Sequence, residues 1–200
     1  MAYFFSLCLV VAAAFLLGSA PFGLIIGKTF CGIDPRSGGS GNVGATNVAR
    51  LCGTKWGVLT LACDLLKGFL PVFVCASSGF GTDSLAPCLA GLAVICGHMF
   101  SIFLGGKGGK GVATTVGVFL ALAPVQLVVS GLTCLFTIWK TGFVSAGSLV
   151  LVLLLPLLFL FSGRFSLFFF SLLVAALVCN AHRENIRRLL RGEEKPWRKR

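Results

Sequence analysis

Long stretches of the chain are apolar and free of charge. Residues 1–27, 84–106, 111–139 and 141–163 contain no Lys, Arg, Asp or Glu. Each run exceeds the about 20 residues that an α-helix needs to cross the hydrocarbon core of a bilayer. The runs are continuously apolar and do not alternate with a period of two, which argues against a transmembrane β-barrel. The pattern predicts an all-α, polytopic membrane protein.

The helices predicted from this pattern span about 3–27, 56–78, 85–104, 141–163 and 165–182, and the run 111–139 adds one or two more. No basic residue precedes the first apolar stretch, so we expect a retained helix and not a cleaved signal peptide. Proline breaks the helical hydrogen-bond ladder, so we expect Pro124 to divide the run 111–139. That division predicts seven transmembrane helices. A single tilted span there predicts five as the alternative.

The composition agrees with this class and excludes others. Of the 200 residues, 56% are hydrophobic and 12% are charged, whereas soluble domains average about 25% charged residues. A soluble enzyme, a disordered linker and a disulfide-stapled secreted module are therefore excluded. The nine cysteines form no CxxC pair. We interpret them as buried small side chains and expect neither a metal nor a cofactor.

The distribution of charge predicts the orientation of the chain, whose net charge is +11. Many of its basic residues lie near the carboxyl end, namely Arg183, Arg187, Arg188, Arg191, Lys195, Arg198, Lys199 and Arg200. By the positive-inside rule this tail is cytoplasmic, and so are the loops at 28–55 and 105–114. The amino terminus is then outside. We expect one transmembrane domain over 1–182 and a basic cytoplasmic tail over 183–200.

The first loop is rich in glycine and in polar side chains. Residues Gly39 to Arg50 read GSGNVGATNVAR. Such a backbone can turn N–H groups toward an anion, and the short helix expected over 43–51 would direct its positive end there. The accompanying polar and basic side chains are Arg36, Ser40, Asn42, Thr46, Asn47 and Arg50. An ordinary glycine-rich connector is the alternative.

Two glycine-rich stretches look like nucleotide-binding motifs but fail the tests for them. Gly39, Gly41 and Gly44 have GxGxxG spacing, but no strand precedes them. The second loop, GGKGGKGVAT over 105–114, lacks the Ser or Thr that follows the lysine of a P-loop. It still places Lys107, Lys110 and Thr114 at the start of a helix, which suits an anion. A positive-inside anchor is the alternative.

Ionisable side chains also occur inside apolar runs. Asp64 and Lys67 are three residues apart and share a helix face. Such groups are costly in a membrane and mark either a functional site or an internal ion pair. His98 is a candidate general base or a packed imidazole. In the tail, His182 and Asn185 share one face, which a basic amphipathic helix alone does not explain.

Three segments match one family in order and spacing. The strings GSGNVGATNVAR, GGKGVAT (108–114) and HRENIRRL (182–189) resemble the acyl-phosphate:glycerol-3-phosphate acyltransferases of bacteria, the PlsY family. Further matches are GSAPFG (18–23), DLLKG (64–68) and GHMFSIFLG (97–105). The resemblance covers essentially the whole chain. Ala20 and Gly106 depart from the residues that the family often has, and neither is a candidate ligand.

The resemblance implies a seven-helix inner-membrane enzyme whose active site faces the cytoplasm. It would transfer a fatty acyl group from a long-chain acyl phosphate to the 1-hydroxyl of sn-glycerol 3-phosphate, the first acylation of phospholipid synthesis. Lysophosphatidic acid and phosphate would be the products. The implied partners are the two substrates, membrane lipid and an enzyme that makes the acyl phosphate, with no nucleic acid.

The resemblance also implies roles by position. The candidate catalytic residues are Ser40, Lys110, His182 and Asn185. The candidate substrate-binding residues are Arg50, Lys107, Gly39, Gly41, Asn42, Thr46, Asn47, Gly108, Gly109 and Thr114, supported by Asp64, Lys67, His98 and Arg36. His182 is a candidate base, and the phosphate of the donor is the alternative proton acceptor. Neither histidine begins the H-x4-D motif of thioester-dependent acyltransferases, which disfavours acyl-CoA as the donor.

Two other classes of function compete with this interpretation. Helices broken by glycine and proline could form the pathway of a phosphate or organophosphate transporter. The polar residues are predicted at one membrane face, however, and no inverted repeat is evident. A purely structural membrane protein needs no convergent phosphate-binding groups. We therefore favour the enzyme.

Overall fold

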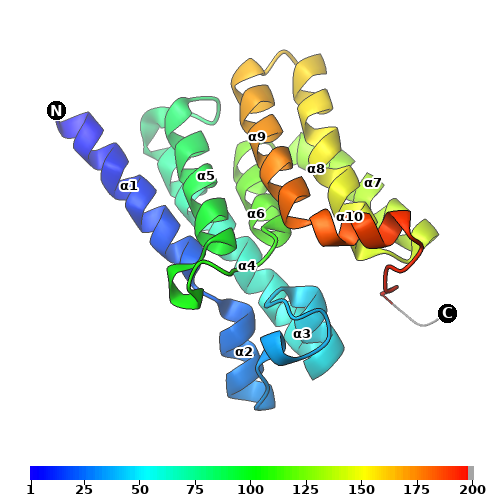
Figure 1. Ribbon diagram of the computed structural model, residues 1–200. Helices are drawn as coiled ribbons and strands as arrows, with labels where there is room; N and C mark the ends of the chain where they lie inside the picture. The colour runs from blue at the N-terminus through cyan, green and yellow to red at the C-terminus, as the bar shows by residue number, and fades with distance from the viewer. Residues whose placement is uncertain (198–200) are drawn as a thin grey trace. The chain divides into compact units, whose positions relative to one another are not determined.

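The computed structural model in Figure 1 describes residues 1–197, and every regular element in that range is helical. The all-α prediction is confirmed for this part of the chain. The chain divides into two compact units, Met1–Leu122 and Ala123–Arg200. Arg198, Lys199 and Arg200 of the predicted basic tail lie outside the described residues.

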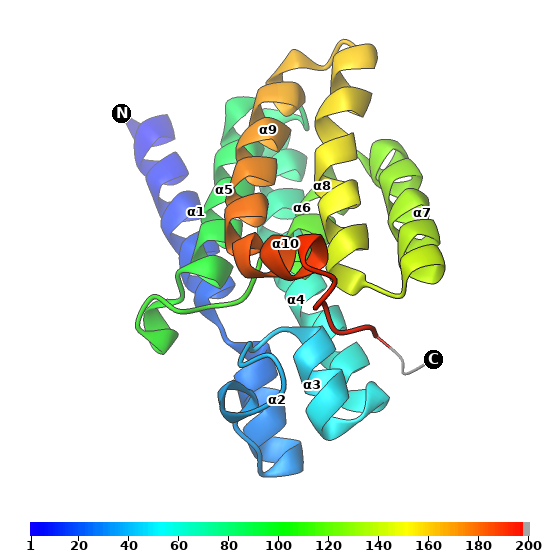
Figure 2. The same ribbon diagram turned by 45° about the vertical axis from the view of Figure 1, so that its right-hand side comes forward.

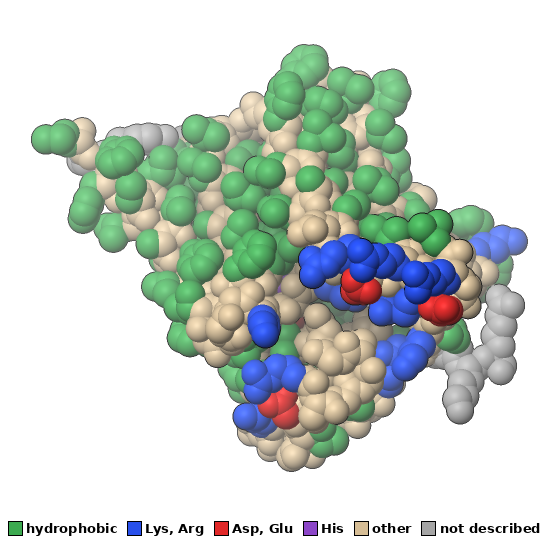
Figure 3. All heavy atoms as spheres, in the orientation of Figure 1, with side chains coloured by type: hydrophobic (Ala, Val, Ile, Leu, Met, Phe, Trp, Pro, Cys, Tyr) green, Lys and Arg blue, Asp and Glu red, His purple; other side chains and the backbone are tan. Residues whose placement is uncertain are grey.

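Several helices are long and apolar enough to cross a membrane. Within the described residues these are Phe4–Cys31, Thr54–Ser78, Leu85–Leu104 and Val144–Phe161. Phe165–Ala181 and Arg183–Leu190, bent by 65°, make a fifth if they are counted as one span. Many large apolar side chains on these helices are exposed, as in Figure 3, which suits contact with lipid. The protein is therefore a multi-pass helical membrane protein.

The first unit contains six α-helices. They are α1 (Ala2–Ser19), α2 (Phe22–Cys31), α3 (Ala45–Cys52), α4 (Thr54–Cys75), α5 (Leu85–Met99) and α6 (Val112–Leu122). Short helical turns lie at Pro35–Ser37, Ala76–Phe80 and Ile102–Leu104. In Figures 1 and 2, α1 lies along α5, and α4 packs against α3 and α6.

The first helix, predicted over about 3–27, lies within one candidate membrane span, Phe4–Cys31, but it is interrupted. The helix breaks at Ala20 and Pro21, and α2 then continues to Cys31. Proline has no N–H to donate to the preceding turn, so the carbonyl groups at the end of α1 need other partners. Side chains from elsewhere in the unit supply them, because Lys67 donates to the carbonyl of Ala20 and Ser101 to that of Ser19.

Glycines allow the helices of this unit to approach closely. Gly68 of α4 lies against the carbonyl of Thr114, and Gly117 of α6 lies against the carbonyl of Leu65. A Cβ at either glycine would overlap with the facing backbone. Small residues at helix contacts are favourable in membranes because association there depends on close packing and not on the hydrophobic effect. These paired contacts fix how α6, and the loop before it, lies on α4.

The second unit contains α7 (Pro124–Thr141), α8 (Val144–Phe161), α9 (Phe165–Ala181) and α10 (Arg183–Leu190). α8 packs against both α7 and α9. The predicted break at Pro124 is confirmed, because α6 ends at Leu122 and Pro124 is the first residue of α7. α10 carries a band of Arg side chains, which Figure 3 shows in blue.

Candidate active site

The first loop is organised around one buried side chain. Asn47, in the first turn of α3, donates through Nδ2 to the carbonyls of Pro35 and Asn42 at 2.8 Å and of Gly38 at 3.2 Å. Its Oδ1 accepts the backbone N–H of Ser40 at 2.8 Å. One amide therefore ties together loop residues on both sides of the glycines. The predicted short helix over 43–51 is confirmed as α3, and Asn47 is the residue that fixes the loop to it.

The glycines of this loop are required by its backbone. Gly39 and Gly41 have φ values of 63° and 68°, which side-chain-bearing residues rarely adopt. A Cβ on Gly39 would also overlap with Oδ1 of Asn47. The turn that results leaves Ser40 exposed at the tip of the loop, while Asn42 accepts the N–H of Gly44 at 2.8 Å. The loop therefore displays Ser40 on a rigid backbone.

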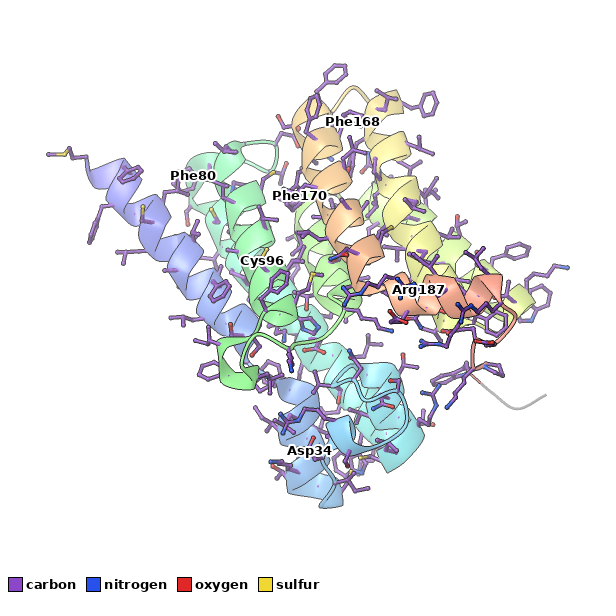
Figure 4. The ribbon with its side chains drawn as sticks, in the orientation of Figure 1. Asp34, Phe80, Cys96, Phe168, Phe170 and Arg187 are labelled. Carbon is purple, nitrogen blue, oxygen red and sulfur yellow. The ribbon has the colours of Figure 1, made fainter. Side chains whose placement is uncertain are left out.

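The two arginines of the first loop have different environments. Arg36 forms a bidentate ion pair with Asp34, with Nη2 2.6 Å from Oδ2, and Figure 4 marks Asp34 in the loop that follows α2. Hydrogen bonds from Arg36 hold the pKa of Asp34 well below its usual range. This ion pair neutralises part of the charge of Arg36, which the sequence analysis expected to help bind an anion. Arg50, in the last turn of α3, is exposed.

The second loop rests on the end of α5. The N–H groups of Gly108 and Gly109 donate to the carbonyls of Met99 and His98, each at 3.0 Å. Lys107 is exposed and Lys110 is half-buried, and α6 begins two residues after Lys110. The lysines therefore lie just before the positive end of a helix, as predicted.

Thr114 lies deeper than the loop itself. Its side chain is fully buried in α6, where its backbone faces Gly68 of α4. Its role as a direct substrate ligand stays a prediction. Thr46, by contrast, is half-buried in the first turn of α3.

A buried polar cluster links α4, α5 and the break between α1 and α2. Lys67 Nζ lies 2.8 Å from Asp64 Oδ1 and donates to the carbonyl of Ala20 at 2.8 Å. His98 Nδ1 is 3.6 Å from the same carboxylate oxygen. All three side chains are less than 8% exposed. A small pocket beside them is lined by Ser19, Ala20, Pro21, Phe22, Gly23, Val43, Ser101 and Leu104. Of the two interpretations of Asp64 and Lys67, the structure contains the internal ion pair.

His182 and Asn185 belong to the second unit, at the bend between α9 and α10. His182 is 2% exposed, and its Nδ1 lies 2.8 Å from the carbonyl of Val178. Because a carbonyl oxygen only accepts, Nδ1 carries a proton and the lone pair of a neutral ring is on Nε2. Asn185 donates through Nδ2 to Glu194 Oε1 at 2.6 Å.

Sequence reasoning missed the partner of Asn185. Glu194 follows α10 in a strongly basic segment, and the sequence analysis assigned it no role. No helical spacing connects positions 185 and 194, so the pairing depends on the chain turning back.

No group of three or more His, Cys, Asp or Glu side chains within residues 1–197 is placed to hold a metal ion.

Comparison with known proteins identifies the family. The sequence model described as glycerol-3-phosphate acyltransferase matches residues 8–192. The chain belongs to this family. A glycerol-3-phosphate acyltransferase of Nitratidesulfovibrio vulgaris is 58% identical over 189 residues, which cover 94% of this chain and 57% of that protein. One of Lawsonia intracellularis is 47% identical over 188 residues, 94% of each chain. The chain thus spans little more than half of the first relative and nearly all of the second.

Solved structures agree with this assignment. The crystal structure of PlsY, an integral membrane glycerol 3-phosphate acyltransferase, in its glycerol 3-phosphate form has a TM-score of 0.92 and 43% identity. It covers 96% of this chain, and this chain covers 95% of it. The lysophosphatidic acid form of PlsY has a TM-score of 0.89 and 42% identity, with the same coverage. The resemblance to the PlsY family inferred from the three sequence motifs is confirmed.

Proposed function

We propose that this protein transfers a fatty acyl group from a long-chain acyl phosphate to the 1-hydroxyl of sn-glycerol 3-phosphate, giving lysophosphatidic acid and phosphate. The observation that carries the proposal is the similarity along nearly the whole chain to PlsY in both its glycerol 3-phosphate and its lysophosphatidic acid forms. Those two molecules are the acceptor and the product of the proposed reaction. The absence of an H-x4-D motif from the sequence supports acyl phosphate as the donor.

The chemistry of this reaction suits the two glycine-rich loops. Both substrates carry a phosphate, so the site needs cations and backbone donors. Ser40 at the tip of the first loop, Arg50, and Lys110 before α6 are proposed to bind glycerol 3-phosphate together with Asn185. Lys107 and the glycines of both loops are proposed to hold phosphate oxygens. Acyl phosphate is already activated, so orientation of the hydroxyl and neutralisation of charge supply most of the catalysis.

His182 is proposed to act beside Asn185 in this site. Its Nδ1 proton is directed at the Val178 carbonyl, so Nε2 is the nitrogen able to accept a proton or a hydrogen bond. If His182 is the base, His182→Gln abolishes turnover at every pH. If the phosphate of the donor takes the proton, His182→Gln retains measurable turnover and mainly raises KM for glycerol 3-phosphate.

We also propose seven transmembrane segments in a bacterial inner membrane, with the amino terminus outside and the loops at 28–55 and 105–114 in the cytoplasm. The positive charge of both loops and of the segment after His182 supports this orientation. Reporter fusions test it. Alkaline phosphatase fused after Gly163 is expected to be active and the same enzyme fused after Gly192 inactive, and the reverse pattern contradicts the orientation.

The proposed reaction requires a supply of acyl phosphate. Membrane lipid surrounds the acyl chain, and an enzyme that forms acyl phosphate from acyl carrier protein is the partner that the reaction implies. The decisive assay gives the detergent-purified protein radiolabelled glycerol 3-phosphate and either palmitoyl phosphate or palmitoyl-CoA, in the presence of EDTA. We expect lysophosphatidic acid from palmitoyl phosphate alone. Turnover only with palmitoyl-CoA, or none from either donor with folded protein, contradicts the proposal.

A further inference from the structure

The segment after α10 folds back and buries a carboxylate. Gly192, with φ of 70°, makes the turn, and the N–H of Glu193 donates to the carbonyl of Arg188 at 2.8 Å. Further along, the N–H of Trp197 donates to the carbonyl of Gly142 at 2.8 Å, which anchors the segment to the loop between α7 and α8. The side chain of Glu194, between these two anchors, is only 8% exposed.

Three donors from two helices surround this carboxylate. Oε1 accepts from Ser145 Oγ of α8 at 2.7 Å and from Asn185 Nδ2 of α10 at 2.6 Å. Oε2 accepts from Arg188 Nε at 2.8 Å. Burial alone would raise the pKa of Glu194, but the hydrogen bonds outweigh it and the pKa is lowered. The group is therefore an ionised carboxylate, which can only accept hydrogen bonds.

An acceptor-only partner decides which way an amide faces. Asn185 must direct Nδ2 at Glu194, and its Oδ1 then lies on the opposite arm of the amide group. An oxygen accepts from a hydroxyl but repels the oxygens of a phosphate. We propose that Glu194 is a positioning residue that holds Asn185 so that Oδ1 receives a glycerol hydroxyl of the acceptor substrate. This inference rests on the proposed function, because it takes Asn185 as a ligand of glycerol 3-phosphate.

Glu194→Gln tests the inference with little change in shape. A glutamine has one side-chain oxygen for two sets of donors, and Arg188 competes for it with Asn185. The side-chain NH2 of the introduced glutamine then faces Asn185 and favours the reversed amide. We expect KM for glycerol 3-phosphate to rise about tenfold, the effect of one substrate hydrogen bond, with KM for palmitoyl phosphate unchanged within about twofold. Glu193→Gln, the same change at the exposed neighbouring residue, is the matched control and is expected to leave both constants unchanged.

A phosphate monoester without a hydroxyl separates positioning from a merely structural role. Methyl phosphate is measured as a competitive inhibitor against glycerol 3-phosphate. If Glu194 acts through a hydroxyl contact, the inhibition constant of methyl phosphate is the same in the wild type and in Glu194→Gln. A parallel rise in this constant and in KM, or no change in KM, overturns the inference. The proposed function fails separately, through absence of acyl transfer in the wild type.

A reversed pair keeps the test decisive if Glu194→Gln does not fold. In Asn185→Asp alone two carboxylates face each other, and we expect turnover to fall by at least about 100-fold. In the double variant Asn185→Asp/Glu194→Gln, the introduced glutamine donates to the introduced aspartate, which again presents an oxygen to the substrate. We expect this variant to recover at least about tenfold of the lost turnover. Equal turnover in the single and double variants overturns the inference.

Discussion

The carbonyl oxygen of His98 accepts the N–H of Gly109 at 3.0 Å, and the imidazole of His98 lies against the same glycine. A Cβ on Gly109 would overlap with Nε2 of the ring. His98 is held in turn near the buried ion pair of Asp64 and Lys67. The end of α5 thus supports the second loop through Gly109. The position of Lys110 depends on this support because Lys110 follows Gly109 in the chain.

Gly109→Ala tests this dependence. The added methyl group must displace either the His98 ring or the loop, and a shift of about 1 Å in a binding group costs about 100-fold in rate. We expect turnover to fall by about that factor while the protein still inserts into the membrane. Gly131→Ala is the control, because a Cβ at Gly131 of α7 would enter open space. Equal activity of the two variants would show that the loop does not need the contact with His98.

Lys110→Ala and Ser40→Ala test the assigned acceptor site. Each removes one charged or hydroxyl donor, and loss of such a donor typically costs about 100- to 1,000-fold in turnover. Neither side chain is buried in a core, so normal expression and an unchanged thermal midpoint are expected. Lys140→Ala, a change of an exposed lysine at the end of α7, is the matched control. Wild-type rates in both test variants would show that the site is assigned wrongly.

Asp64→Asn tests the buried ion pair. Removal of one charge leaves Lys67 buried without its counter-ion, which typically costs about 3–5 kcal/mol. We expect a lowered thermal midpoint in detergent, measured by circular dichroism. The double variant Asp64→Leu/Lys67→Met removes both charges and is expected to recover part of the stability, because the carbonyl of Ala20 still loses its hydrogen bond from Lys67. A double variant no more stable than Asp64→Asn would mean that Asp64 and Lys67 stabilise the fold by more than neutralising each other's charge.

Gly117→Ala tests the close contact of α4 and α6. The new Cβ would overlap with the carbonyl of Leu65, so the helices must separate. Overpacking of this kind costs about 1–3 kcal/mol, and we expect the thermal midpoint to fall. Gly131→Ala, in an uncrowded helix position, is expected to maintain or raise it. Similar midpoints for the two variants would indicate that α6 can move away from α4 without loss.

The stability of the second unit is expected to depend on pH through Glu194. The folded pKa of Glu194 is below the ordinary value of 4.5. Its contribution is therefore complete above about pH 4.5 and is lost as pH falls through the lower folded pKa. Thermal midpoints of the wild type measured from pH 6 to pH 3 are expected to fall more steeply than those of Glu194→Gln. Parallel curves would show that protonation of Glu194 does not weaken the fold.

Local chemistry explains why some of the site could be predicted. Asp64 and Lys67 form an ion pair because residues three apart in any α-helix share a face. The break before Pro124 follows from the missing N–H of proline. Gly39 and Gly41 have positive φ, a backbone conformation that glycine adopts readily, and both lie in the glycine-rich stretch of the sequence. Each of these features depends on neighbours along the chain.

The sequence by itself determined the class of the protein, its charged and glycine-rich loops and, through three ordered motifs, its family. The tertiary structure alone decided which groups support those loops. Asn47 ties the first loop, His98 supports the second, and Glu194 binds Asn185. These contacts join residues from different elements or across a reversal of the chain. Hydrogen bonding and close packing act between atoms that folding brings together, and no spacing in the sequence encodes such partners.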